Sequence, residues 1–198
     1  MKSLNFYFDY SSPFAYLGAT EIFKLADQNN ASVVHKPFLL GALFKAIGTP
    51  MVPLHSFNAP KQRYYQRDLE LWAQHWGVPL LQPSAFPINT VGPLRLTLVA
   101  LAEAPERVTP LVLRIFSAFW AEDQDISRPE VLASLLSELE LPVTWLEKIS
   151  TPEVKAELRD RTSEAVEKGV CGAPSFEVNG ELFWGQDRLD FVRNALSA

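Results

Sequence analysis

Residues 4–18 read LNFYFDYSSPFAYLG and join a short apolar run to a helical pattern. Residues 4–10 carry aromatic and aliphatic side chains on both faces, as is typical of a strand buried on both sides. From residue 13 to about residue 28, apolar residues recur at spacings of three and four, which predicts a helix. Ser12 and Pro13 suit the start of that helix, because serine is favoured as an N-cap and proline at the first helical position. The stretch therefore predicts a buried strand followed at once by a helix N-terminus.

The remaining order of elements predicts one α/β fold with an inserted helical block. SVVHKPF at residues 32–38 is typical of a second strand, and residues 40–169 carry helical patterns only. SFEV and ELFW then flank Asn179-Gly180, a dipeptide that favours a tight hairpin because both residues tolerate positive φ. A last helix is expected from residue 187 to about residue 196. We predict that both ends of the chain pair in one sheet, with one domain at residues 1–39 and 170–198 and a helical insertion domain at residues 40–169.

Two helix starts inside the inserted block carry capping signals. Ser127 and Glu130 have the spacing of a capping box, in which each side chain satisfies the backbone amide of the other residue. Thr151 followed by Pro152 marks a second start, because proline has no N–H to satisfy at the first helical position. Two proline-rich loops, at residues 48–60 and 78–93, are longer than typical connections, and long ordered loops are often functional.

Composition and charge exclude several classes of protein. The net charge of −5 and the scattered basic residues argue against binding to a nucleic-acid backbone. His35, His55 and His75 are isolated, so the sequence shows no metal-ligand spacing. Cys171 is the only cysteine, which excludes an intramolecular disulfide. There is no N-terminal apolar segment of the signal-peptide type and no apolar run near the roughly 18 residues of a membrane span, so we expect a soluble, cytoplasmic protein.

Four motifs together resemble one group of enzymes. FYFDYSSPFAYLG at residues 6–18 and GVCGAPSFEVNGELFWGQDRLDF at residues 169–191 are similar to the ends of kappa-class glutathione transferases and 2-hydroxychromene-2-carboxylate isomerases, which are relatives of the disulfide oxidase DsbA. PFLLGALFKAIG at residues 37–48 and KQRYYQRDLELWAQHWGVPL at residues 61–80 resemble the isomerase branch. The resemblance covers nearly the whole chain. It implies a DsbA-like thioredoxin fold with a helical insertion, a homodimer, and a role in the breakdown of aromatic hydrocarbons.

The resemblance directs attention to Ser12. The oxidases of this group carry a Cys-Pro-x-Cys pair here, whereas this chain has Ser12 and Ala15, so a dithiol–disulfide cycle is chemically excluded. The resemblance implies that the Ser12 hydroxyl donates a hydrogen bond to the thiolate of bound glutathione. The N–H groups and dipole of the helix N-terminus also stabilise an anion there and lower a thiol pKa. The alternatives are that Ser12 only caps the helix and that Ser11 takes the role instead.

Further glutathione contacts follow from the same resemblance. Ala173-Pro174 resembles the cis-proline loop of thioredoxin-like proteins, which presents backbone groups to the cysteinyl part of glutathione. The alternative for this pair is a plain turn before the hairpin. Asp187 resembles the acid that binds the γ-glutamyl ammonium, and its alternative role is to cap the last helix. The implied glutathione-binding set is Ser12, Pro13, Phe14, Ala173, Pro174, Trp184, Gly185, Gln186 and Asp187.

Three residues are candidates for binding the second substrate. Lys45 resembles a residue placed near the substrate carboxylate, where an ammonium would orient an acid group. Asn58 and Lys61 are further candidates in and after the first proline-rich loop. Phe14, Phe86 and Trp184 could wall an aromatic substrate, although aromatic side chains are more often part of the core. Related chains commonly carry asparagine after the glycine that corresponds to Gly48, where this chain has Thr49.

The sequence leaves three functional hypotheses. The first is a glutathione-dependent cis–trans isomerase that converts 2-hydroxychromene-2-carboxylate to trans-o-hydroxybenzylidenepyruvate, or a related unsaturated 2-oxo acid, through a transient glutathione adduct. The second is a kappa-type glutathione transferase or peroxidase that uses the same thiolate. The third is a non-catalytic thiol-binding module. The isomerase is the preferred hypothesis, with glutathione as the cofactor, no metal, and a small aromatic 2-oxo acid as the substrate.

Overall fold

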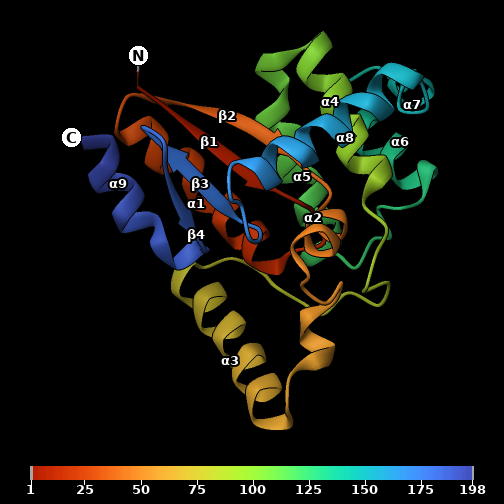
Figure 1. Ribbon diagram of the computed structural model, residues 1–198. Coiled ribbons are helices and arrows are strands. Elements are labelled where there is room, and N and C mark those ends of the chain that lie inside the picture. Colours follow the sequence, from red (N-terminus) through yellow and green to blue (C-terminus); the bar gives the residue numbers. More distant parts are fainter. Residues whose placement is uncertain (1, 198) are drawn as a thin grey trace.

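The computed structural model describes residues 2–197, which contain a four-stranded mixed sheet in the order β2-β1-β3-β4 (Figure 1). β1 pairs with β2 in parallel and with β3 antiparallel, and β3 pairs with β4 antiparallel. The sheet and its first helix are β1 (Lys2–Phe8), α1 (Pro13–Gln28), β2 (Ala31–Pro37), β3 (Ser175–Val178) and β4 (Glu181–Trp184). The prediction that both ends of the chain form one sheet is confirmed.

The inner position of β1 explains its two apolar faces. Phe6 lies opposite His35 on β2 and opposite Phe176 on β3, so both edges of β1 are hydrogen-bonded. The Phe6 ring stacks on Phe8 with a centroid distance of 4.9 Å and on Phe176 at 5.5 Å. A strand with neighbours on both sides and helices packed against it buries side chains of both faces, as its sequence predicted.

The inserted block is helical, as predicted. It contains α2 (Leu40–Ile47), α3 (Ala59–Trp76), α4 (Val91–Glu103), α5 (Val108–Trp120), α6 (Pro129–Glu138), α7 (Trp145–Lys148) and α8 (Pro152–Glu167), with short 3-10 turns η1 (Pro53–Ser56) and η2 (Pro105–Arg107). In Figure 1, α3 extends away from the body of the molecule, and α4, α6, α7 and α8 gather on the side opposite the final helix, α9 (Leu189–Ser197). The division into two domains stays a prediction, and its outermost positions, 1 and 198, lie outside the described residues.

Two predicted helix starts are wrong, because each helix begins further along the chain than the expected capping residue indicates. Ser127 does not cap α6, because Pro129 takes the first helical position and Arg128 becomes the N-cap; the Ser127 hydroxyl instead donates to Asp125. Asp187 does not open the last helix, because it lies inside a 3-10 turn, η3 (Gln186–Arg188), that precedes α9. The third start is confirmed, since the Thr151 hydroxyl accepts the N–H of the third helical residue of α8.

The segment between β1 and α1 is held from the helical side. The indole N–H of Trp120 on α5 donates to the carbonyl oxygen of Tyr10 over 2.8 Å. The Tyr10 hydroxyl and the Thr97 hydroxyl on α4 are hydrogen-bonded over 2.6 Å, and both side chains are fully buried. α4 and α5 therefore fix the position from which α1 begins. Within residues 2–197, no helix combines the length and the apolar character that crossing a membrane requires.

Candidate functional site

The Ser12 hydroxyl lies at the N-terminus of α1 and makes two hydrogen bonds. Its Oγ accepts the amide N–H of Ala15 over 3.1 Å, which is the N-cap interaction, and it donates to the carbonyl oxygen of Ala173 over 2.7 Å. Ser12 is buried, with only 6% of its surface exposed. Because a hydroxyl carries one hydrogen, the whole donor capacity of Ser12 is directed at Ala173. Within residues 2–197, neither a histidine nor a lysine is hydrogen-bonded to this hydroxyl.

A buried carboxylate organises the backbone before Ser12. Asp9 is 1% exposed, and its two oxygens accept the amide N–H of Ser11 at 3.0 Å and of Leu40 at 2.8 Å. Burial raises the pKa of Asp9, and these hydrogen bonds oppose that rise. Asp9 therefore ties the loop before α1 to the first residue of α2. Ser11 directly precedes the N-cap residue, and its amide donates to Asp9 over 3.0 Å.

The Ala173–Pro174 peptide bond is cis, as the resemblance implied. The ring of Pro174 lies against Gly18 of α1, where an added Cβ would come within 3.1 Å of its Cγ. The carbonyl oxygen of Pro174 accepts the amide N–H of Gly185 over 3.0 Å. The N–H of Ala173 has no hydrogen-bond partner among residues 2–197. This loop therefore offers one unused backbone donor beside the Ser12 hydroxyl.

The GQDR segment, residues 185–188, begins at Gly185, the residue whose amide donates to Pro174. Gly185 has a φ of 111°, which only glycine adopts readily, and the Asp187 carboxylate folds back over it. Asp187 is partly exposed and pairs with Arg188 over 3.2 Å, while Gln186 is buried. η3 packs on α1, so the sequence-predicted residues of this segment are brought to the same region as Ser12.

Asp68 on α3 is a site residue that the sequence reasoning missed. Its pKa is raised first by partial burial and then by the negative charge of Asp187, while a hydrogen bond from Trp72 opposes the rise. The charge of Asp187 on η3 therefore acts on the Asp68 carboxyl on α3. No local pattern signals this pairing, because Asp68 lies among ordinary polar residues of an amphipathic helix.

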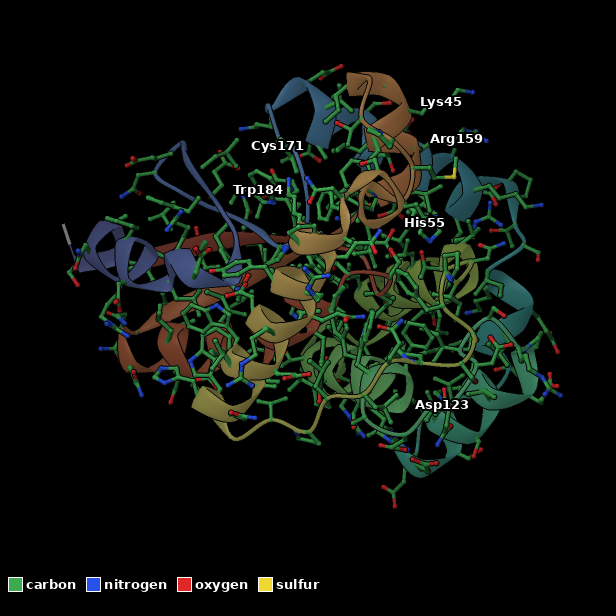
Figure 2. All side chains as sticks on the ribbon, turned by 90° about the horizontal axis from the view of Figure 1, so that it is seen from below. Lys45, His55, Asp123, Arg159, Cys171 and Trp184 are labelled. Carbon is green, nitrogen blue, oxygen red and sulfur yellow. The ribbon has the colours of Figure 1, made fainter. Side chains whose placement is uncertain are left out.

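Trp184 and Cys171 lie at the edge of the site. Figure 2 shows both labelled side chains on neighbouring segments. The indole of Trp184 covers Gly172 so closely that an added Cβ would lie 2.5 Å from its Nε1, yet 59% of Trp184 is exposed. Cys171 is exposed, and partial burial raises the pKa of its thiol, so its environment does not favour a thiolate.

Phe14 and Lys61, two of the residues proposed to contact the second substrate, lie against one group of aromatic side chains. Phe14 meets Tyr65 of α3 edge-to-face at 5.3 Å, and Lys61 lies over the Phe57 ring at 4.1 Å. Tyr65 also contacts Phe57, so α1, α3 and the loop before α3 share one aromatic group. Asn58 is accounted for structurally, because its side-chain oxygen caps α3 by accepting the N–H of Lys61.

Lys45 and Phe86 are not drawn into this aromatic group. Lys45 is exposed on α2, and Figure 2 shows it beside Arg159, away from Cys171 and Trp184. Phe86 is half-buried and packs on Trp120 at 5.9 Å. Lys45 therefore lies on a different element from Ser12 and Ala173.

The family model of the DSBA-like thioredoxin domain matches residues 3–197. The chain belongs to this family. A 2-hydroxychromene-2-carboxylate isomerase from Pseudomonas putida is 30% identical over 197 residues, which cover 98% of this chain and 93% of that protein. Glutathione s-transferase kappa 2 of Caenorhabditis elegans is 27% identical over 210 residues, which cover 99% and 92%. Within the DSBA-like family, the chain therefore falls in the group of these isomerases and kappa-class transferases.

A solved structure of a 2-hydroxychromene-2-carboxylate isomerase superimposes with a TM-score of 0.85 at 26% identity and covers 98% of this chain and 94% of that one. The thioredoxin fold and its helical insertion are thus those of the DSBA-like family. Members named as disulfide oxidases or reductases need cysteines, whereas this chain has Ser12 and Ala15 at the start of α1. Relatives about 30% identical to this chain are named as isomerases, which supports an enzymatic role for this member.

Proposed function

We propose that the protein is a glutathione-dependent isomerase that converts 2-hydroxychromene-2-carboxylate to trans-o-hydroxybenzylidenepyruvate, or a related unsaturated 2-oxo acid. The observation that carries the proposal is the buried Ser12 hydroxyl at the N-terminus of α1, beside the unpaired N–H of Ala173. The site has the surroundings of a redox centre, but Ser12 and Ala15 stand where a redox pair of cysteines would begin α1. A thiol supplied by a ligand would complete it.

The residues present fit glutathione in three respects. The N–H of Phe14 has no hydrogen-bond partner among residues 2–197, and together with the helix dipole it favours an anion, so a thiolate is stabilised at this end of α1. The N–H of Ala173 is available to an extended peptide backbone. The negative charge of Asp187 raises the pKa of Asp68, and a cation bound near both carboxylates would relieve that repulsion. The γ-glutamyl ammonium of glutathione has the required charge.

Ser12 changes its hydrogen-bond partner in this proposal. Its hydrogen points to the Ala173 carbonyl, and a rotation about the Cβ–Oγ bond redirects it to a thiolate at the helix terminus. The Ala173 carbonyl then accepts an N–H from the peptide backbone of the ligand, so no buried polar group loses its partner. The Ala15 N–H continues to donate to Ser12 and holds the oxygen in place.

Bound glutathione supplies a sulfur nucleophile that adds reversibly to the conjugated double bond of the substrate and permits its rotation. The protein orients the acid and stabilises its developing charge. Lys61, over Phe57 and next to the Phe14–Tyr65 pair, is positioned to contact an aromatic acid near α1. Lys45 and Asn58 remain proposed substrate contacts. The proposal carries the expectation of a cytoplasmic homodimer, which light scattering of the purified protein tests in part.

Calorimetric titration of glutathione, paired with an absorbance assay on 2-hydroxychromene-2-carboxylate, tests the proposal. We expect micromolar-to-millimolar binding and glutathione-dependent turnover in the wild type, and loss of turnover in Ser12→Ala. Ser11→Ala is the matched control, because it removes a neighbouring hydroxyl without touching the α1 cap. Absence of glutathione binding to the folded wild type would refute the proposal.

A kappa-type transferase is the second candidate, favoured by the 27% identity to the Caenorhabditis elegans transferase. It uses the same thiol site on a halogenated or peroxide substrate. Conjugation of chlorodinitrobenzene without isomerase turnover would select the transferase. Turnover of the chromene carboxylate with unconsumed glutathione would select the isomerase.

A further inference from the structure

A cavity that is open to solvent lies between α2, α4 and α8, apart from the residues around Ser12 and Ala173. Its volume is about 340 Å³, and none of its lining residues belongs to the set around Ser12 and Ala173. This size falls in the range of small-molecule sites, roughly 300–1,000 Å³. Most of the wall surface is apolar, and its apolar residues are Leu39, Ala42, Ala46, Val91, Leu158 and Val166.

Three cations line this cavity. They are Arg95 on α4 and Lys155 and Arg159 on α8, and no carboxylate lines the cavity with them. None of the three forms an ion pair within residues 2–197. Three positive charges thus converge on one cavity in a chain whose net charge is −5.

Two of the acids of α8 pair with cations outside the cavity. Glu157 pairs with Arg161 over 2.8 Å, and Glu164 pairs with Lys36 over 2.7 Å. Both pairs involve cations that do not line the cavity. The other three acids of α8, Glu153, Asp160 and Glu167, do not line the cavity, so no acid of this helix neutralises it from within.

Arg95 gives the second, independent observation. Its Nε is buried and has no hydrogen-bond partner among the described residues. A buried N–H of a charged group that lacks a partner is destabilising, and folded proteins satisfy nearly all such groups. The hydroxyl of Thr162 on the same wall is already engaged, since it donates to Leu158 and accepts the N–H of Leu39. No described residue supplies the acceptor that the Nε–H of Arg95 lacks, so this position is open to an acceptor atom of a ligand.

We propose that the cavity between α2, α4 and α8 binds a small organic carboxylate with an apolar body. A guanidinium matches a carboxylate in geometry and binds it by charge-assisted hydrogen bonds. The apolar walls favour a hydrocarbon or aromatic body over a strongly hydrated inorganic anion. Low-dielectric walls also strengthen the attraction between the cations and the carboxylate. This site is independent of glutathione and of Ser12.

The test is a titration of para-fluorobenzoate into the isotope-labelled full chain, without glutathione, followed by amide and fluorine NMR. We expect saturable shifts at Ala42, Ala46 and Ser163. Arg95→Gln and Arg159→Gln should each weaken binding by about tenfold, since a charge-assisted hydrogen bond is lost. Arg128→Gln is the control, because it removes an exposed positive charge outside the cavity and should leave the affinity unchanged.

Para-fluorobenzamide, which has nearly the same shape without the charge, should bind at least about tenfold more weakly than the carboxylate. Equal binding of the two compounds would overturn the proposal, and so would unchanged affinity in both folded arginine variants. Shifts confined to Ser12, Ala173 and their neighbours would also overturn it, because the carboxylate would then occupy the thiol site. Failure of glutathione binding in the separate assay leaves this result unaffected.

Discussion

Replacement of Ser12 by alanine separates a thiolate-stabilising role from a simple helix cap. In the structure, the Ser12 oxygen accepts from Ala15 over 3.1 Å and donates to Ala173 over 2.7 Å. With glutathione bound, the donated hydrogen bond would go to the sulfur. The Ser12→Ala variant therefore loses both the cap and the hydrogen bond that stabilises the charged form of the thiol.

The magnitude follows from the contacts. A hydrogen bond to a charged group contributes about 1.5–3 kcal/mol, which corresponds to a rise of about 1–2 units in the pKa of the bound thiol. The free energy of unfolding should also fall. The lost cap costs about 1 kcal/mol, and the Ala173 carbonyl, left without its partner in a residue that is 8% exposed, costs about 1–3 kcal/mol. The sum is a destabilisation of about 2–4 kcal/mol.

The assay is a pH titration of the thiolate absorbance of bound glutathione, with denaturant unfolding measured in parallel. Thr151→Ala is the matched control, because Thr151 also caps a helix before a proline and lies on α8. It should lose about 1 kcal/mol of stability and leave the thiol pKa unchanged. If Ser12→Ala binds glutathione with an unchanged thiol pKa, Ser12 is only a cap and the reasoning is wrong.

Three further outcomes are expected. Burial lowers the pKa of His35 from 6.5 to about 4, so the unfolded state binds the proton first as the pH falls. The free energy of unfolding should therefore be unaffected by His35 above pH 6.5 and should fall by up to about 3 kcal/mol between pH 6.5 and pH 4. Denaturation curves measured across this pH range should show the loss in the wild type and not in His35→Gln. Asp68→Asn should weaken glutathione binding by roughly threefold to tenfold in calorimetry, because one carboxylate facing the ammonium is lost. Gly172→Ala should displace the Trp184 indole, whose Nε1 would lie 2.5 Å from the new Cβ, and should change tryptophan fluorescence with little loss of stability.

Each outcome has a control. His75→Gln changes an exposed histidine and should keep the wild-type pH profile; an identical profile in His35→Gln would contradict the assignment. A glutathione analogue without the α-ammonium should bind wild type and Asp68→Asn with equal affinity. If the variant still binds the analogue more weakly, attraction between Asp68 and the ammonium is not the cause. Trp184→Phe should abolish the fluorescence response to Gly172→Ala. A response that persists in that background would come from another tryptophan.

Local chemistry was sufficient for much of the fold. The Ser-Pro start of α1, the Asn179-Gly180 hairpin and the Thr151 cap each depend on a few adjacent residues, and the structure contains all three. The two wrong starts show the limit of local patterns. Ser127 lost the cap position to Arg128 because the proline comes one residue too late for a capping box. Asp187 fell inside a 3-10 turn because the backbone already turns at Gly185.

The sequence by itself determined the order of strands and helices along the chain. It also determined that α1 begins without a redox cysteine. Those features follow from periodicity, turn chemistry and residue identity, which act over one or two turns of chain. Only the tertiary structure decided that the Ser12 hydroxyl donates to Ala173, 161 residues away, and that the charge of Asp187 acts on Asp68. The same holds for the three cations around the cavity between α2, α4 and α8. Such contacts depend on how distant elements pack, and no local pattern of residues encodes a distance between two helices.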